Sequence, residues 1–174
     1  KRRSQGSLFK SEGMPGFRSR WTRSSGPRSM ARARLDSVMK AQVLFAASVK
    51  GEVMVLTDWL SFGGGLDPES GRISDQSHPQ VDHCITKKIL VLPGVRGSAG
   101  SPSTLAESLR LGTGPGAVIL GEAETSSLAA AFVAKELYQI RIPVLVLSKI
   151  DYGEMRNGQI VRIEESGLLS ELQT

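Results

Sequence analysis

A loop rich in glycine, serine and arginine, residues 93–102, has the composition of an anion-binding site. Its glycines let the backbone approach a ligand closely, and the amino end of a following helix favours negative charge. Arg96 provides a planar fork of donors suited to a carboxylate or phosphate, and Ser98 provides a hydroxyl in the same loop. Ser101 is expected to cap the helix, with Pro102 at its first position. The alternative is an ordinary loop whose serines only cap that helix.

Two familiar nucleotide-binding motifs do not fit this loop. A Walker A loop requires Gly-Lys-Ser/Thr, and no lysine follows Gly97 or Gly100. The dinucleotide fingerprint requires the spacing G-x-G-x-x-G, whereas the glycines at 94, 97 and 100 are three residues apart. Glu122 stands where a ribose-binding acid could lie, but the glycine spacing disfavours a dinucleotide.

A second glycine-rich segment reads Ser61-Phe62-Gly63-Gly64-Gly65-Leu66-Asp67-Pro68 and leads towards His78-Pro79. Three consecutive glycines lower stability unless the backbone must approach a ligand closely or adopt a positive φ. A flexible loop between strands is the alternative interpretation.

The chain has two histidines and one cysteine, which limits its metal chemistry. His83 and Cys84 are neighbours, but two ligands are too few for a structural zinc site. We therefore expect no metal on this chain and interpret Cys84 as a small buried side chain. One cysteine cannot form an internal disulfide, so a reducing compartment and a cytoplasmic location are expected.

Short apolar runs that alternate with helical patterns predict the framework of the first loop. Residues 89–92, 117–120 and 144–147 are typical of buried parallel strands. Helices are predicted from about Pro102 to Leu111 and from Ser126 to Tyr138, the second with one apolar face made of Ala129, Phe132, Val133 and Leu137. This alternation indicates a βαβαβ unit, in which the loop after residue 92 lies at the carboxyl end of a strand, where open α/β sheets bind ligands.

Further strands complete an α/β domain predicted over residues 38–165. Residues 43–45 and 53–56 are predicted to be two strands joined by a short turn at Lys50-Gly51. Asn157-Gly158 predicts a tight turn into a last strand over 159–163. Residues 1–37 are predicted to be a disordered basic tail or linker, and residues 166–174 a C-terminal tail.

The charge of the 174 residues is unevenly distributed. Residues 1–34 hold ten basic side chains and one acidic one, a net +9, whereas the remaining 140 residues hold 12 basic and 16 acidic ones, a net −4. A nucleic-acid-binding fold is expected to carry its basic patch on the folded domain, so nucleic acid is a disfavoured partner. The tail also has the composition of an organellar targeting segment. No run of about 18 apolar residues is present, so no membrane span is expected.

Taken together and in order, the segments resemble the small subunit, or swivelling domain, of aconitase X over roughly residues 40–165. The resemblance rests on Ser61-Phe62-x-Gly64-Gly65-x-Asp67-Pro68, then His78-Pro79, then Arg96-Gly97-Ser98-x-x-Ser101. It departs from the family at Asp82 and Lys87, where glycines are expected, and at Gly63, where an aromatic residue is common.

The resemblance implies a swivelling β/β/α domain like the mobile last domain of aconitases. It also implies a large partner subunit that carries an iron or iron–sulfur centre, without which this chain is expected to be inactive. The implied activity is dehydration of a small hydroxy acid, with cis-3-hydroxy-L-proline preferred over mevalonate 5-phosphate. A non-catalytic anion-binding module is the other alternative.

The resemblance also implies roles for residues of both loops. Ser98 is the expected general base. The expected substrate-binding residues are Arg96, Gly97 and Ser101 from the first loop and Ser61, Phe62, Gly63 and Gly64 from the second.

Overall fold

The computed structural model of the chain describes residues 38–97 and 99–172. The predicted basic tail over residues 1–37 lies outside them. The strands are β1 (Val38–Lys40), β2 (Gln42–Phe45), β3 (Val49–Val55), β4 (Leu66–Asp67), β5 (Arg72–Ile73), β6 (Ile89–Leu92), β7 (Ala117–Leu120), β8 (Val144–Val146), β9 (Ile160–Ile163) and β10 (Leu168–Glu171). The helices are α1 (Phe62–Gly65), α2 (Ser101–Leu111), α3 (Ser126–Tyr138) and α4 (Lys149–Glu154).

The main sheet has the strand order β1-β10-β9-β3-β6-β7-β8-β2 and closes on itself. Strands β3, β6, β7 and β8 are parallel, and the other pairings are antiparallel. The two ends of this order, β1 and β2, are separated along the chain by Ala41 alone. One nearly continuous segment therefore pairs with β10 at one end and with β8 at the other.

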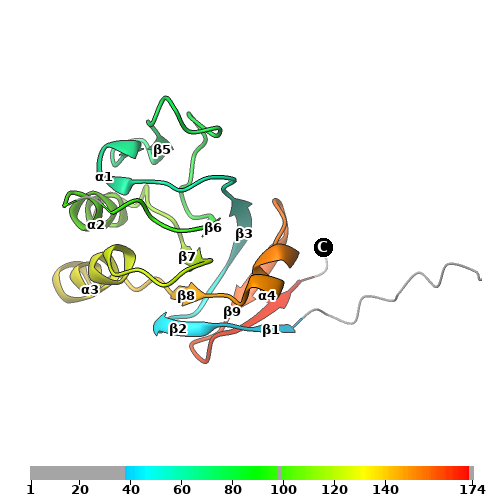
Figure 1. The fold of residues 1–174 in the computed structure, drawn as a ribbon. Coiled ribbons are helices and arrows are strands. Elements are labelled where there is room, and N and C mark those ends of the chain that lie inside the picture. The colour runs from blue at the N-terminus through cyan, green and yellow to red at the C-terminus, as the bar shows by residue number, and fades with distance from the viewer. Residues whose placement is uncertain (1–37, 98, 173–174) are drawn as a thin grey trace, which may run out of the picture. The chain divides into compact units, whose positions relative to one another are not determined.

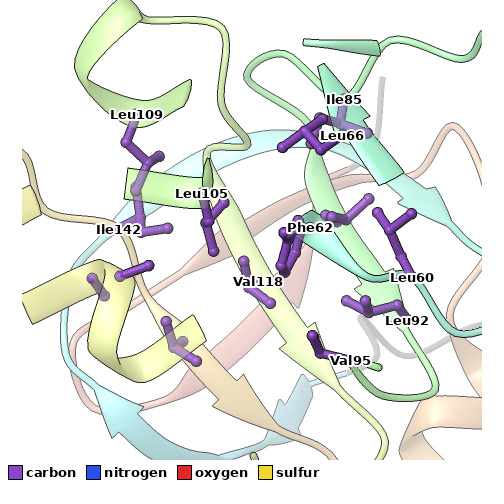
Figure 2. Packing of buried hydrophobic residues seen from close by; sticks show 14 of the residues in the cluster. Leu60, Phe62, Leu66, Ile85, Leu92, Val95, Leu105, Leu109, Val118 and Ile142 are labelled. Atoms are coloured by element: carbon purple, nitrogen blue, oxygen red, sulfur yellow. The ribbon is translucent and has the colours of Figure 1, made fainter. Parts of the chain in front are cut away.

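Two hydrophobic cores lie on opposite faces of the parallel strands. Helices α2 and α3 cover one face, where Leu105, Leu109 and Ala131 pack with Leu92 and Val118 (Figures 1 and 2). On the other face, side chains of the parallel strands pack with side chains of β1, β9 and β10, the antiparallel part of the sheet. The result is the predicted β/β/α layering, which the structure confirms.

The predicted βαβαβ unit is also confirmed. Every residue of β6 and β7 is buried, which is why these strands read as continuous apolar runs. Helix α2 ends at Gly112, whose φ of +77° is the left-handed conformation that terminates many helices. Helix α3 has the predicted bounds.

Two predictions about the ends of the sheet are wrong. Lys50-Gly51 is not a turn but lies inside β3, and β2 pairs with β8 rather than with β3. A side chain at Gly51 would come within 3.2 Å of Ile89 on the neighbouring strand, so this glycine serves close strand packing. The predicted tail over 166–174 contains β10, which pairs with both β1 and β9 and belongs to the domain.

The face of α3 that lies against the sheet differs from the apolar face seen in the sequence. The buried residues are Ser127, Ala130, Ala131 and Ala134. The larger apolar side chains point outward, with Phe132 51% and Leu137 67% exposed. The large apolar residues at helical spacing predicted the wrong buried face, because the small residues beside them are the ones that pack against the core.

Asp82 and Lys87 have left-handed backbones, with φ of +64° and +58°. These are the two positions where the resemblance expects glycine. A side chain there is sterically disfavoured, because Cβ comes close to the backbone in this region. The backbone at both positions therefore has the conformation that glycine adopts most easily, although neither residue is glycine.

Candidate functional site

The loop after β6 follows the extension of β3 along the carboxyl edge of the sheet. Leu60 and Val95 form a parallel bridge, and the Arg96 amide donates to the Leu60 carbonyl at 3.0 Å. A side chain at Gly94 would overlap the Trp59 ring at 2.3 Å, so only glycine fits beneath that indole. The parallel alignment thus continues past the ends of both strands and fixes the position of the Arg96 backbone.

The Arg96 side chain extends towards acidic residues that the sequence analysis did not single out. Its Nη2 donates to the two carboxylate oxygens of Asp58 at 3.4 and 3.3 Å. Asp75 is also close: the hydroxyl and amide of Ser77 hold the pKa of its carboxyl below the usual range, and the Arg96 charge adds to this effect. Arg96 therefore bonds to one carboxylate and interacts electrostatically with a second. Neither was recognisable beforehand, because both are separated from Arg96 by many residues.

The two glycine-rich segments meet at the amino end of α2. The Gly63 amide donates to Ser101 Oγ at 3.2 Å, and a side chain at Gly100 would lie 3.7 Å from Gly63 Cα. Ser101 is fully buried and is the first residue of α2, whose N-cap is Gly100. The prediction that Ser101 caps the helix is therefore wrong, since its hydroxyl instead joins the helix start to the other loop.

The segment around α1 is a tight turn rather than a regular helix. Ser61 Oγ donates to the Gly63 carbonyl at 3.0 Å, and Gly64 has a φ of +88° that favours glycine. Phe62, predicted to contact substrate, is fully buried beside Leu60 and Leu105 (Figure 2). Phe62 therefore anchors the turn in the core, and the backbone of Gly63 and Gly64 remains at the site.

Two of the predicted site residues differ in what the structure says of them. Gly97 is exposed, and an added side chain would meet no described atom within 4 Å, so its φ and packing place no demand for glycine. Ser98, the predicted base, lies outside the described residues. The structure thus links Ser61, Gly63 and Ser101 by hydrogen bonds and holds the Arg96 amide at the Leu60 carbonyl, next to Ser61 in the chain.

His78 and Gln80 support the same edge of the sheet. His78 is buried, its Nδ1 accepts from the Gln80 amide at 3.0 Å, and its Nε2 lies 3.4 Å from the Asp58 carbonyl. The Gln80 side chain accepts from the Thr57 amide at 2.9 Å and donates to the Val55 carbonyl at 2.8 Å. The His-Pro motif was noticed in the sequence, but this supporting role could not be read from it.

Cys84 is exposed, so its interpretation as a buried side chain is wrong. Hydrogen bonding with Thr86 lowers the pKa of the thiol, and Arg72 and Lys88 add smaller effects. Cys84 borders an open hollow of about 270 Å³, together with Glu52 and Lys88. Within residues 38–97 and 99–172, no group of three or more histidine, cysteine, aspartate or glutamate side chains could hold a metal ion.

Within the same described ranges, no helix is both long and apolar enough to cross a membrane.

Comparison with known proteins gives a consistent family. A family model described as "Aconitase X swivel domain" matches residues 38–170. The chain is 34% identical over 108 residues to the cis-3-hydroxy-L-proline dehydratase of Pseudomonas aeruginosa, covering 62% of this chain and 19% of that protein. It is 35% identical over 125 residues to the phosphomevalonate dehydratase small subunit of Pyrococcus horikoshii, covering 72% of this chain and 87% of that one.

The fold has a solved counterpart. Aconitase X of Thermococcus kodakaraensis, in its holo form, superposes with a TM-score of 0.69 at 30% identity, covering 79% of this chain and 99% of the matched chain. The same domain thus resembles about a fifth of the cis-3-hydroxy-L-proline dehydratases and nearly the whole of separate small subunits. The chain belongs to the aconitase X swivel-domain family.

Proposed function

We propose that this chain is the small subunit, or swivelling domain, of an aconitase X-type hydro-lyase that dehydrates a small hydroxy acid. The observation that carries the proposal is the meeting of two loops at the amino end of α2, where the Gly63 amide donates to Ser101 Oγ and where the loop that carries Arg96 and Ser98 ends. Membership of a family whose named relatives are dehydratases supports the reaction class.

The partner in this proposal is a large subunit or domain that holds the iron or iron–sulfur centre. The relatives named as small subunits support a separate partner, and the cis-3-hydroxy-L-proline dehydratases, about five times the matched length, support a fused one. A cytoplasmic location remains the expectation for this pair.

The leading substrate is cis-3-hydroxy-L-proline. Its carboxylate suits the bidentate fork of Arg96 and the backbone amides at the start of α2. Mevalonate 5-phosphate is the second candidate, favoured by the relatives that match nearly their whole length and are named phosphomevalonate dehydratase small subunits. It also carries an anion that Arg96 could bind.

The proposed step is an elimination in which a carbon loses a proton and its neighbour loses the hydroxyl as water. The partner's metal centre would supply Lewis-acid chemistry at the leaving hydroxyl. Ser98 is the proposed acceptor of the carbon-bound proton. A serine is a weak base unless nearby positive charge stabilises its alkoxide, and Arg96 and the amino end of α2 could provide that charge in a closed, desolvated site. Arg96 and the loop amides would hold the substrate anion meanwhile.

The test is an assay of the chain co-purified with its large partner, on each substrate separately. We expect turnover by the pair, none by the chain alone, and a rate below about one tenth for Ser98→Ala, since tenfold in rate equals roughly 1.4 kcal/mol of barrier. Ser103→Ala is the matched control, because Ser103 is exposed on α2 and is expected to leave the rate unchanged.

Inactivity of the pair on both substrates would contradict the proposed reaction, whereas an active Ser98→Ala pair would contradict only the base. Turnover of mevalonate 5-phosphate alone would select the second substrate. Activity of the chain alone would remove the need for a partner.

A further inference from the structure

The Asp58–Arg96 pair connects two segments whose backbones are each held in place. The extension of β3 is fixed on one side of Asp58 by Leu56, whose amide donates to the Val91 carbonyl at 2.7 Å, and on the other by the Leu60–Val95 bridge. The Asp58 carboxylate itself accepts from the Trp59 amide at 2.7 Å. The position of the Asp58 carboxylate is therefore held by contacts that do not involve Arg96.

This ion pair is poorly suited to a purely stabilising role. The two side chains are 54% and 41% exposed, and exposed pairs contribute little to stability because water screens them. What the pair does is limit the directions in which the guanidinium of Arg96 can point. That orientation matters because a bidentate donor discriminates by geometry as well as by charge.

The contacts leave most of the guanidinium available for a ligand. Both hydrogen bonds to Asp58 come from Nη2, and Nη1 and Nε donate no side-chain hydrogen bond to any of the described residues. A guanidinium has five donor hydrogens, so one edge can be held by Asp58 while others bind an anion.

We propose that Asp58 is a positioning residue that orients Arg96 for the substrate anion. The inference rests on the proposed function, because it names the residue that sets the geometry of that site. Asp58 does not contact substrate in this scheme and acts only through Arg96.

Asp75 provides a matched control from the same surroundings. Its charge and that of Arg96 interact, but its carboxylate accepts hydrogen bonds from Ser77, at 2.9 Å from the amide and 2.6 Å from the hydroxyl. Removing the Asp75 charge changes the electrostatics near Arg96 without removing a hydrogen bond to it. Asp58→Asn removes the charge and weakens the contact itself.

The experiment measures kcat and KM of the co-purified pair for Asp58→Asn, Asp58→Glu and Asp75→Asn. Because a misoriented guanidinium makes a poorer bidentate contact with the substrate anion, Asp58→Asn is expected to raise KM about tenfold with kcat within about twofold. Asp58→Glu is expected to recover part of this loss, and Asp75→Asn to leave KM within about twofold. Thermal unfolding of each variant shows whether it is folded.

Three outcomes would overturn the inference. An unchanged KM in Asp58→Asn would show that Arg96 needs no orienting residue. A lower KM would show that Asp58 competes with substrate for the guanidinium, and equal effects of Asp58→Asn and Asp75→Asn would reduce the role to charge alone. A wild-type pair inactive on both substrates would instead refute the proposed function, so the two failures are distinguishable.

Discussion

Helices α2 and α3 follow neighbouring parallel strands and pack on the same face of the sheet, yet their amino ends are satisfied differently (Figure 1). At α3 the Glu124 carboxylate accepts from the amides of Ser126 and Ser127, so a side chain of the chain itself meets the positive end of the helix. At α2, no side chain among the described residues caps the helix. The difference teaches that a carboxylate of the chain already meets the amino end of α3, whereas the proposal assigns the substrate anion to the amino end of α2.

The same two helices also differ in what they bury. Helix α2 buries Leu105 and Leu109, whereas α3 buries Ala130, Ala131 and Ala134. Small side chains let a helix lie close to its neighbours, so a larger residue on the buried face of α3 is expected to overpack the core.

A larger side chain on the buried face of α3 is expected to change the unfolding free energy more than any other substitution proposed for the two helices. Ala131 is fully buried in the core. Ala131→Leu is therefore expected to cost about 3 kcal/mol of unfolding free energy through overpacking. Ala129→Leu, on the exposed face, is expected to stay within about 0.5 kcal/mol. Urea unfolding measures both, and a reversed ranking would mean that α3 packs through its larger residues.

The second prediction concerns the start of α2. Ser101→Ala removes the acceptor of the Gly63 amide in a buried place, so it is expected to cost about 1–2 kcal/mol and to speed hydrogen exchange at Gly63. Ser103→Ala is the control, because the Ser103 hydroxyl donates only to the nearby Gly100 carbonyl on an exposed surface. Unchanged hydrogen exchange at the Gly63 amide in Ser101→Ala would contradict the hydrogen bond that joins the two loops.

The third prediction tests the carboxylate at α3. Glu124→Ala is expected to cost about 1 kcal/mol, since it leaves two amides at the helix start without their acceptor. Glu122→Ala, on the same loop and exposed, is expected to change little. If both variants lose equal stability in thermal unfolding, the effect comes from net charge rather than from capping.

The smallest effect is expected on the outward face of α3. Leu137→Gln is expected to change the unfolding free energy by no more than about 0.5 kcal/mol, because the side chain is 67% exposed. Phe132 is a poorer choice for this test, because its ring packs edge-on against the Phe45 ring, with 5.1 Å between the ring centroids. A loss of about 2 kcal/mol or more in Leu137→Gln would show that this face packs within the chain.

The sequence predicted best what depends on local apolar runs. Strands β6, β7 and β8 are buried on both faces, so their residues are apolar without interruption and could be located directly. The pairing of β2 with β8 and of β10 with β1 could not be located in this way, because it joins residues about 100 or more positions apart.

The candidate site divides along the same line. Arg96 and Ser101 were found because glycine, serine and arginine gather in one short loop after a strand. Asp58 and Asp75 were missed, because their interactions with Arg96 join segments that are far from that loop in the sequence. Local composition identified the loop, and only tertiary structure could identify its acidic neighbours.

The closed sheet has a consequence for the order in which the domain forms. Val38 of β1 pairs with Ser170 of β10, and Gln42 of β2 pairs with Val146 of β8. The segment that begins the domain can therefore pair only after β8 and β10 have been made. Contacts between such distant residues form slowly, because a long loop must close before they stabilise anything. During synthesis, β1 and β9 both keep unpaired edges until β10 has left the ribosome, so the sheet is completed only when the last strand of the domain has been made.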